Sequence, residues 1–118
     1  MTTPDSGGVP IGPAFSALAR VYGDAAVERI TGAHCCVVGI GGVGSWVAES
    51  LARSGVGSIT LIDHDDISES NINRQVHADV TTLNQSKVEV MATRIRQINP
   101  ACDCHPVDDM LVPNNIEK

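Results

Sequence analysis

The sequence predicts an α/β fold, namely a Rossmann-like βαβαβ unit with three parallel strands that forms half of a doubly wound sheet and is preceded by two short helices. Two observations support this prediction. A short β-branched run ends at a glycine cluster and is followed at once by an amphipathic segment, in the order strand, tight turn, helix. A second apolar run, a periodic helical segment and a third run then follow. Right-handed crossovers between such strands give the sheet order three-two-one.

Each element is placed by its periodicity and by the turn formers around it. We expect helices over residues 15–21, 24–30, 46–53 and 85–98. We expect strands over residues 34–38, 57–63 and 102–107. Asp24 is expected to be the N-cap of the second helix, and Pro100 stops the last one. The first two strands read as buried parallel strands. The third helix is expected to turn one stripe inward, comprising Val43, Trp46, Val47, Ser50 and Leu51.

The length of 118 residues allows one domain. Residues 1–12 carry turn formers and are expected to be a flexible lead, which leaves residues 13–118 as a nucleotide-binding half-domain. In doubly wound folds, further strands add beside the first strand, and no sequence remains here to make them. We therefore expect a chain that is truncated relative to the complete fold, with its first strand at a sheet edge.

Composition excludes several classes of function. The formal net charge of −6 gives no general attraction to a nucleic acid backbone or an anionic membrane. No apolar run is long enough to cross a membrane, and the N-terminal residues lack the basic and apolar regions of a secretory signal. The cysteines are expected to be structural thiols, which favours the cytoplasm: Cys35, Cys36, Cys102 and Cys104.

The glycine cluster at residues 39–44 reads G-x-G-G-x-G and contains the dinucleotide fingerprint G-x-G-x-x-G. Gly39 lets the strand turn sharply, Gly41 removes a Cβ where a phosphate approaches, and Gly44 lets the helix pack close to the strand. The free N–H groups at the start of that helix then face the phosphates. The alternative is a glycine-rich turn that binds no ligand.

An acidic residue and a long loop follow the second strand. Asp63 lies about 20 residues past the glycines, the spacing expected of a ribose ligand. The polar segment 63–78 is too long for an ordinary connection, and long loops in compact domains are usually functional. The sequence therefore predicts a nucleotide site at the carboxyl ends of the strands.

These residues resemble a known family. The segments VVGIGGVGSWVAESLARSGVGSITLIDHDDISESNINRQVHA and SKVEVMATRIRQINP are similar to the ThiF/MoeB/ubiquitin-activating superfamily of adenylating enzymes, and ARVYGDAAVERITGAH favours its tRNA threonylcarbamoyladenosine dehydratase branch. The resemblance implies a homodimeric enzyme that uses ATP and Mg²⁺ to adenylate a substrate carboxylate. In the dehydratase branch that carboxylate belongs to a threonylcarbamoyl group on tRNA, and ring closure releases AMP with net loss of water.

The resemblance also implies which residues bind the nucleotide: Gly39, Gly41, Gly42, Gly44, Asp63, Asp65, Asn71, Arg74, Gln75 and Lys87. Arg74 and Lys87 match the family's phosphate-binding cations and are the expected catalytic residues. The family's magnesium aspartate would lie beyond residue 118, so we expect no metal ligand set in this chain. Arg20 is the one candidate for an arginine that relatives supply across the subunit interface.

Each of these residues also has a structural interpretation. Asp63 and Asp65 are alternatively ordinary loop acids, Arg74 a solvated loop charge, and Lys87 a surface lysine. Two residues of the loop, Asn71 and Gln75, alternatively pin its backbone. His77 is interpreted as a packed or capping histidine rather than a catalyst, and Trp46 as a core residue.

Three alternative functions stay open. One keeps the chemistry and changes the substrate to the C-terminus of a sulfur-carrier or ubiquitin-like protein. Another is an NAD-dependent oxidoreductase domain, for which Arg74 and Lys87 have no use because NAD has no triphosphate. The third is a non-catalytic remnant.

Overall fold

The computed structural model describes residues 15–110, and the expected lead at residues 1–12 lies outside them. The described elements are α1 (Ser16–Tyr22), α2 (Asp24–Thr31), β1 (His34–Val38), α3 (Gly44–Arg53), β2 (Ser58–Asp63), the 3₁₀ helix η2 (Glu69–Asn71), α4 (Lys87–Ile98) and β3 (Asp103–Asp108). The strands form one parallel sheet in the order β1-β2-β3. The fold class and the strand order are therefore confirmed, and the predicted elements end within about two residues of the observed ones.

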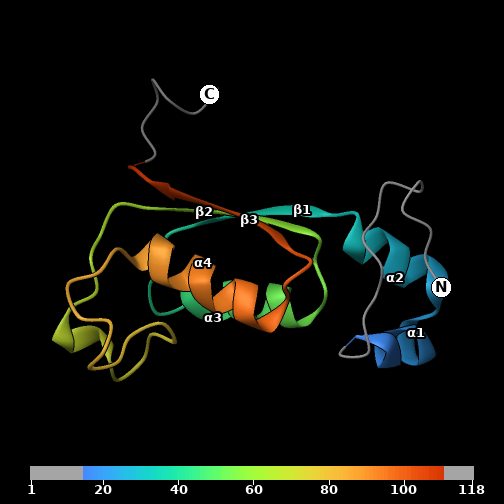
Figure 1. The fold of residues 1–118 in the computed structure, drawn as a ribbon, viewed down its shortest axis with the longest axis horizontal. Coiled ribbons are helices and arrows are strands. Elements are labelled where there is room, and N and C mark those ends of the chain that lie inside the picture. Colours follow the sequence, from blue (N-terminus) through green and yellow to red (C-terminus); the bar gives the residue numbers. More distant parts are fainter. Residues whose placement is uncertain (1–14, 111–118) are drawn as a thin grey trace.

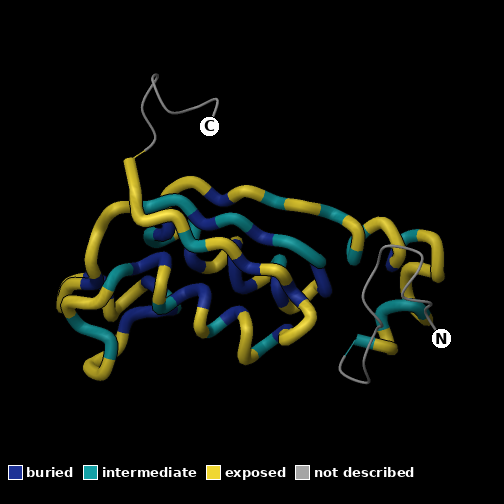
Figure 2. The backbone as a smooth tube through the Cα atoms, turned by 45° about the horizontal axis from the view of Figure 1, so that its top comes forward, coloured by how far each residue is buried: buried dark blue, intermediate teal, exposed yellow. Residues whose placement is uncertain are grey.

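The helices α3 and α4 lie on one face of the sheet, and α1 and α2 lie beyond its end (Figure 1). Figure 2 shows the buried backbone concentrated between the sheet and this helix pair. On β2, Ile59 and Leu61 are fully buried, whereas their neighbours Thr60 and Ile62 are half-buried. This alternation shows that one face of the sheet carries the core, and no element within residues 15–110 covers the other face.

The prediction that β1 is a buried strand is wrong. Cys36 and Val38 are exposed, Cys35 is half-buried and only Val37 is buried. The reason is position: β1 is an edge strand, and alternate side chains point to the uncovered face. In contrast, Cys104 on β3 points to the helix side, and burial raises the pKa of its thiol, which fits the structural role expected of it.

The predicted inward stripe of α3 is also wrong except at Leu51, which is half-buried and packs against the core. The buried residues are Ser45, Ala48, Glu49 and Ala52, whereas Val43, Trp46 and Val47 are exposed and Trp46 is not a core residue. Small side chains let the helix lie close to the sheet. Val43, Val47 and Leu51 instead border a hollow of about 540 Å³ beside β1.

Glu49 is buried because two arginines neutralise it. It accepts hydrogen bonds from the guanidinium of Arg94 on α4, one of them at 3.1 Å, and from Nε of Arg53 at 3.2 Å. The hydrogen bond from Arg94 is the main cause that holds the pKa of Glu49 below its usual value, despite the opposing effect of burial. A charged side chain that lies outside the stripe predicted to face inward thus joins α3 to α4.

The two leading helices are short, as predicted. Gly23, not Asp24, is the N-cap of α2, and Asp24 is its first helical residue. The carboxylate still lies at the favourable end of the helix dipole. Gly57 allows α2 to approach the sheet, since a Cβ at this glycine would overlap the carbonyl oxygen of Thr31.

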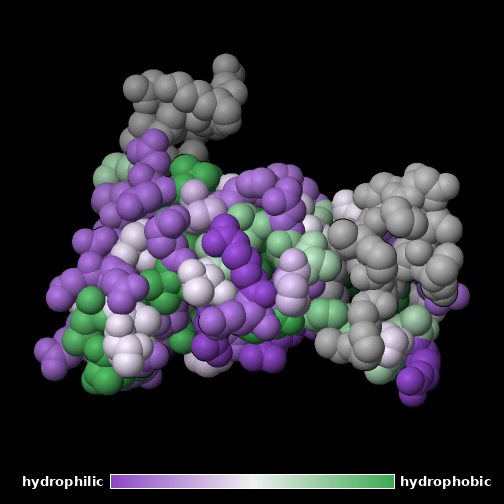
Figure 3. Space-filling model, in the orientation of Figure 1, coloured by the Kyte–Doolittle hydropathy of each residue, from purple (hydrophilic) through white to green (hydrophobic). Residues whose placement is uncertain are grey.

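Exposed apolar side chains are also found on the long loop between β2 and α4, residues 64–86, at Ile72 and Val80. Hydrophobic surface gathers over this loop at the lower left of Figure 3. No helix within residues 15–110 is long and apolar enough to cross a membrane.

Gly44 is predicted to be the least replaceable glycine of the turn. A Cβ at Gly44 would overlap the backbone carbonyl of Gly39, whereas a Cβ at Gly42 would meet only the Arg74 side chain, at 3.6 Å. We expect Gly44→Ala to lower the free energy of unfolding by about 1–3 kcal/mol, and Gly42→Ala to change it little. Urea denaturation of both variants measures this. Equal stability of the two variants would contradict the close approach described here.

Candidate functional site

The candidate site lies where β1 and β2 end and α3 and α4 begin (Figure 1). Parallel topology brings these ends to the same edge of the sheet, which is where α/β folds bind ligands. Two segments form the site: the glycine turn, residues 39–44, and the long loop, residues 64–86. Each predicted site residue lies on or beside one of them.

The glycine turn is held against the end of β2. Gly39 has a positive φ of 85°, and its N–H donates to the carbonyl oxygen of Ile62 at 2.8 Å. The N-cap residue of α3, Val43, provides no side-chain hydrogen bond to the first amides of the helix. These amides, together with the helix dipole, form a feature that favours an anion.

Asp63 is fixed by two backbone amides. Its Oδ2 accepts from the N–H of Ile40 at 2.7 Å, and its Oδ1 accepts from the N–H of Asp65 at 2.9 Å. Partial burial opposes ionisation, but these two hydrogen bonds and the charge of Lys87 outweigh it, so the pKa of Asp63 lies below its usual value. The structure therefore presents an ionised carboxylate of defined orientation next to the glycine turn.

Arg74 lies over the glycine turn. Its Nε and aliphatic carbons are 3.6–3.8 Å from the position that a Cβ would take on Gly42. Its Nη1 donates to the carbonyl oxygen of Ser70 at 2.9 Å and to Oδ1 of Asn73 at 3.2 Å. The indole Nε1 of Trp46 donates to the backbone carbonyl of Arg74 at 2.7 Å. The guanidinium thus keeps its remaining N–H groups available at the turn.

Two other predicted residues, Asn71 and Gln75, shape the loop. Oδ1 of Asn71 accepts from the N–H of Ser68 at 2.8 Å in the capping box of η2, so this side chain pins the loop backbone. Gln75 is buried, and its Nε2 is 3.8 Å from the position of a Cβ on Gly41. Its Oε1 is buried without a hydrogen-bond partner among the described residues.

Lys87 is not a surface lysine. It is the first residue of α4, only 6% of it is exposed, and its backbone N–H donates to the carbonyl oxygen of Asp65 at 3.1 Å. Its positive charge acts on both Asp63 and His77. Within residues 15–110, neither Lys87 nor Arg74 has a carboxylate partner in an ion pair.

His77 is packed, as its sequence interpretation expects, but its contact with the glycine turn was not predicted. It is 2% exposed, and its Nε2 lies 2.8 Å from the carbonyl oxygen of Ile40 in the glycine turn. Burial is the main cause that lowers the pKa of His77; the Lys87 charge adds to it, while the Ile40 carbonyl and the Asp63 carboxylate oppose it. Its only sequence signal is its place two residues after the Arg-Gln pair of the loop.

One group of potential metal ligands is present among the described residues. Ligand atoms of Asp63, His64 and Asp65 lie within 4.8 Å of one another. Asp63 already accepts two amide hydrogen bonds, whereas the side chain of Asp65 is exposed. Mg²⁺ is commonly held by one or two carboxylates together with substrate phosphates, so Asp65 fits as one ligand rather than as a complete site.

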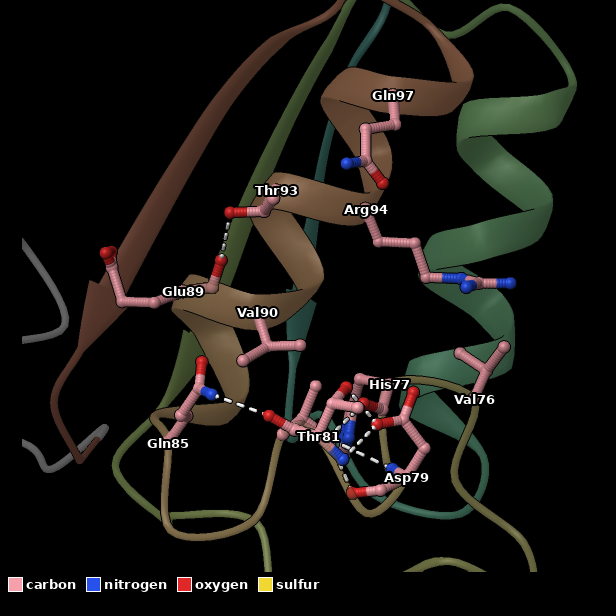
Figure 4. A pocket seen from close by; sticks show the side chains of 11 residues that line it. Val76, His77, Asp79, Thr81, Gln85, Glu89, Val90, Thr93, Arg94 and Gln97 are labelled. Carbon is pink, nitrogen blue, oxygen red and sulfur yellow. Dashed lines mark hydrogen bonds between the residues drawn. The ribbon is translucent and has the colours of Figure 1, made fainter.

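A second hollow, of about 450 Å³, lies between the loop and α4 (Figure 4). Arg94 and Glu89 project from α4 at its edge, and Asp79 bonds to Thr81 at its floor. None of the glycine-turn residues lines it. The predicted nucleotide residues therefore gather at the sheet edge and not in this hollow.

The ThiF family pattern matches residues 15–118. The chain belongs to the ThiF family. The tRNA threonylcarbamoyladenosine dehydratase of Escherichia coli is 56% identical over 102 residues, which is 86% of this chain. The E. coli molybdopterin-synthase adenylyltransferase is 39% identical over 85 residues.

Solved structures of ThiF relatives have the same fold. The crystal structure of the E. coli dehydratase in complex with ATP matches 91% of this chain with a TM-score of 0.86 and 54% identity, and a second structure of that enzyme contains AMP. The chain spans 38% of the length of the E. coli dehydratase sequence and 46% of the chain in the ATP complex.

Burial of neutral His77 predicts a pH dependence of stability. Its pKa in the folded state is below the ordinary 6.5, so the unfolded state binds more protons as the pH falls through that range. This contribution is fully present above about pH 6.5 and is lost as the pH falls toward the folded-state pKa. We expect wild-type stability in urea to drop between pH 7.5 and pH 5.5 by more than that of His77→Gln. An equal drop in both proteins would contradict the burial of a neutral imidazole.

Proposed function

We propose that this ThiF chain is the ATP-binding part of an enzyme that adenylates a carboxylate. The observation that carries the proposal is the pair of cations, Arg74 and Lys87, that lack carboxylate partners among the described residues and border the glycine turn and Asp63. Two such charges beside uncapped helix amides suit a polyphosphate. An NAD-binding domain would have no triphosphate for them to hold.

Each residue has a proposed role. The amides of Gly41 and Gly42 and the start of α3 receive phosphate oxygens, and Asp63 accepts hydrogen bonds from the ribose hydroxyls. Arg74 binds phosphate through its free N–H groups, since a planar guanidinium suits bidentate contacts. Lys87 neutralises charge that develops as pyrophosphate leaves. Asn71 and Gln75 keep the loop in place, and Asp65 contributes one oxygen to the Mg²⁺ that accompanies ATP.

The proposed chemistry converts a carboxylate oxygen, which is a poor leaving group, into AMP, which is a good one. A substrate carboxylate oxygen attacks the α-phosphorus of ATP, the bond to the bridging oxygen breaks, and pyrophosphate departs, leaving an acyl-adenylate. A nucleophile within the substrate then attacks the acyl carbon, AMP leaves, and a ring closes with net loss of water. Arg74 and Lys87 would serve the first step, in which negative charge accumulates on phosphate oxygens.

The proposed substrate is the threonylcarbamoyl group of tRNA threonylcarbamoyladenosine. Support comes from the names of the relatives with 56% and 50% identity, both tRNA threonylcarbamoyladenosine dehydratases. The second candidate is the C-terminus of a sulfur-carrier protein, which the 39% identity to molybdopterin-synthase adenylyltransferase favours less. A homodimer acting in the cytoplasm completes the proposal.

The first prediction from this proposal concerns the choice of nucleotide. The chain is expected to bind ATP with Mg²⁺ in preference to NAD, because Arg74 and Lys87 together match a triphosphate. Isothermal titration of the 118-residue chain with each nucleotide measures both affinities. Tighter binding of NAD than of ATP would contradict adenylation.

The second prediction concerns catalysis and uses a chimera. Residues 15–118 replace the matching part of the E. coli dehydratase, and dehydration of threonylcarbamoyladenosine in tRNA is assayed together with ATP–pyrophosphate exchange. In this background, Arg74→Ala and Lys87→Met are each expected to lower exchange by roughly 10²–10³-fold. Arg74→Lys is not expected to restore it, because the bidentate geometry is lost.

Arg29→Ala is the matched control, since Arg29 is exposed on α2, outside the candidate site. Its exchange rate should equal that of the parent chimera. Unchanged exchange in either site variant would remove that residue from the proposed machinery. A chimera that exchanges pyrophosphate but leaves the tRNA unmodified would favour the second substrate.

A further inference from the structure

The backbone of Ile40, at the start of the glycine turn, is held at both its N–H and its carbonyl. Its N–H donates to Oδ2 of Asp63 at 2.7 Å, and its carbonyl oxygen lies 2.8 Å from Nε2 of His77. The Ile40 side chain is fully buried. Asp63 comes from the end of β2 and His77 from the long loop, so two distant segments fix the two consecutive peptide planes that meet at Ile40, namely Gly39–Ile40 through its N–H and Ile40–Gly41 through its carbonyl.

Such a constraint matters because two glycines come directly after Ile40 in the turn. Gly41 and Gly42 have no side chains to limit their backbone angles, and glycine samples more conformations than any other residue. The N–H of Gly41 lies in the same peptide plane as the Ile40 carbonyl, so a group that holds this carbonyl fixes the direction of that N–H, and Gly42 follows directly after it. Gly39, on the other side of Ile40, is held by the hydrogen bond to Ile62. The Ile40 clamp, meaning Asp63 on the N–H and His77 on the carbonyl of this residue, completes the fixation of the turn.

His77 has the chemistry that a carbonyl oxygen requires. The Ile40 carbonyl accepts only, so Nε2 of the imidazole must carry the hydrogen. Two charged groups face His77, namely Lys87 at the start of α4 and Asp63 at the end of β2, and burial keeps the ring neutral. Nδ1 then carries a lone pair and has no partner within the described chain. A neutral ring with its hydrogen on Nε2 satisfies all of these contacts.

Hydrogen bonds between the loop residues just before His77 and the start of α3 bring its side chain next to the Ile40 carbonyl. The N–H of Val76 donates to Oγ of Ser45 at 3.3 Å, and Nε1 of Trp46 donates to the carbonyl oxygen of Arg74 at 2.7 Å. Loop residues 74–77 therefore run along the turn and the first residues of α3. Among these contacts, the one made by His77 reaches the turn itself.

We propose that His77 is a positioning residue: its Nε2–H holds the Ile40 carbonyl and thereby orients the Gly41 and Gly42 amides toward the nucleotide phosphates. The inference rests on the proposed function for its ligand, which is a nucleoside triphosphate. His77 does not touch the reacting atoms. It acts through the backbone of the turn, in partnership with Asp63.

The test compares two amide substitutions in the 118-residue chain. The Gln side chain in His77→Gln extends its NH₂ group about as far as Nε2 of the imidazole, whereas that in His77→Asn reaches only about as far as Nδ1. We expect His77→Gln to bind ATP within threefold of the wild-type affinity and His77→Asn to bind at least tenfold more weakly. Thermal denaturation accompanies each titration, so that affinities are compared at a temperature where both variants are folded.

A second measurement needs no nucleotide. Amide hydrogen exchange, resolved to single residues, should be at least tenfold faster at Ile40 in His77→Asn than in the wild type and nearly unchanged in His77→Gln. The Gly39 amide, which bonds to Ile62, is the internal control. A third measurement uses the wild type alone: imidazole ¹⁵N shifts should report a neutral ring with its hydrogen on Nε2 at pH 7.

The outcomes separate the two proposals. Equal ATP affinity of the Asn and Gln variants, unchanged exchange at Ile40, or a hydrogen on Nδ1 would each overturn the role of His77. If the wild-type chain bound no ATP, the proposed function would fail and the clamp would lose its ligand, while exchange at Ile40 would still decide whether His77 holds the turn.

Discussion

The contact between the start of α3 and the end of β1 is the constraint on which the site depends. Gly44 lies so close to the carbonyl of Gly39 that no side chain fits between them. The helix therefore begins directly beside the strand, and its first amides open onto the edge of the sheet. The long loop then closes over the same edge, with Arg74 against Gly42. A small residue at one position thus determines where the charged residues gather.

Local patterns were sufficient to predict much of this architecture. The glycine spacing, the periodicity of α4 and the apolar runs located the three strands, their order and the helices between them. The same reasoning reversed the faces of α3, because it assumed that large apolar residues point inward. Ala48 and Ala52 instead face the sheet, and Glu49 is buried because its partner Arg94 comes from a helix far along the chain. Pairing across such a distance leaves no signal in a local pattern.

In the site, too, some residues were predicted from the sequence and one was not. Asp63 was predicted from its spacing to the glycines, and Arg74 and Lys87 from the resemblance to the adenylating superfamily. The structure brings all three to the same sheet edge as the glycine turn. The part played by His77 was not predictable, since it depends on one hydrogen bond to a backbone carbonyl 37 positions away. The exposure of β1 was missed for another reason: its edge position was predicted, but alternate side chains of the strand also point to a face of the sheet that no element within residues 15–110 covers.

The indole of Trp46 has a practical consequence. Trp46 is the only tryptophan of the chain, it is 51% exposed, and its N–H bonds to the backbone carbonyl of Arg74. Indole emission responds to the hydrogen bonding and polarity around the ring. The protein therefore carries an intrinsic optical reporter at the point where the loop meets α3. A movement of the Arg74 backbone would change the wavelength of its fluorescence without any added label, which makes the loop observable on the millisecond timescale of mixing experiments.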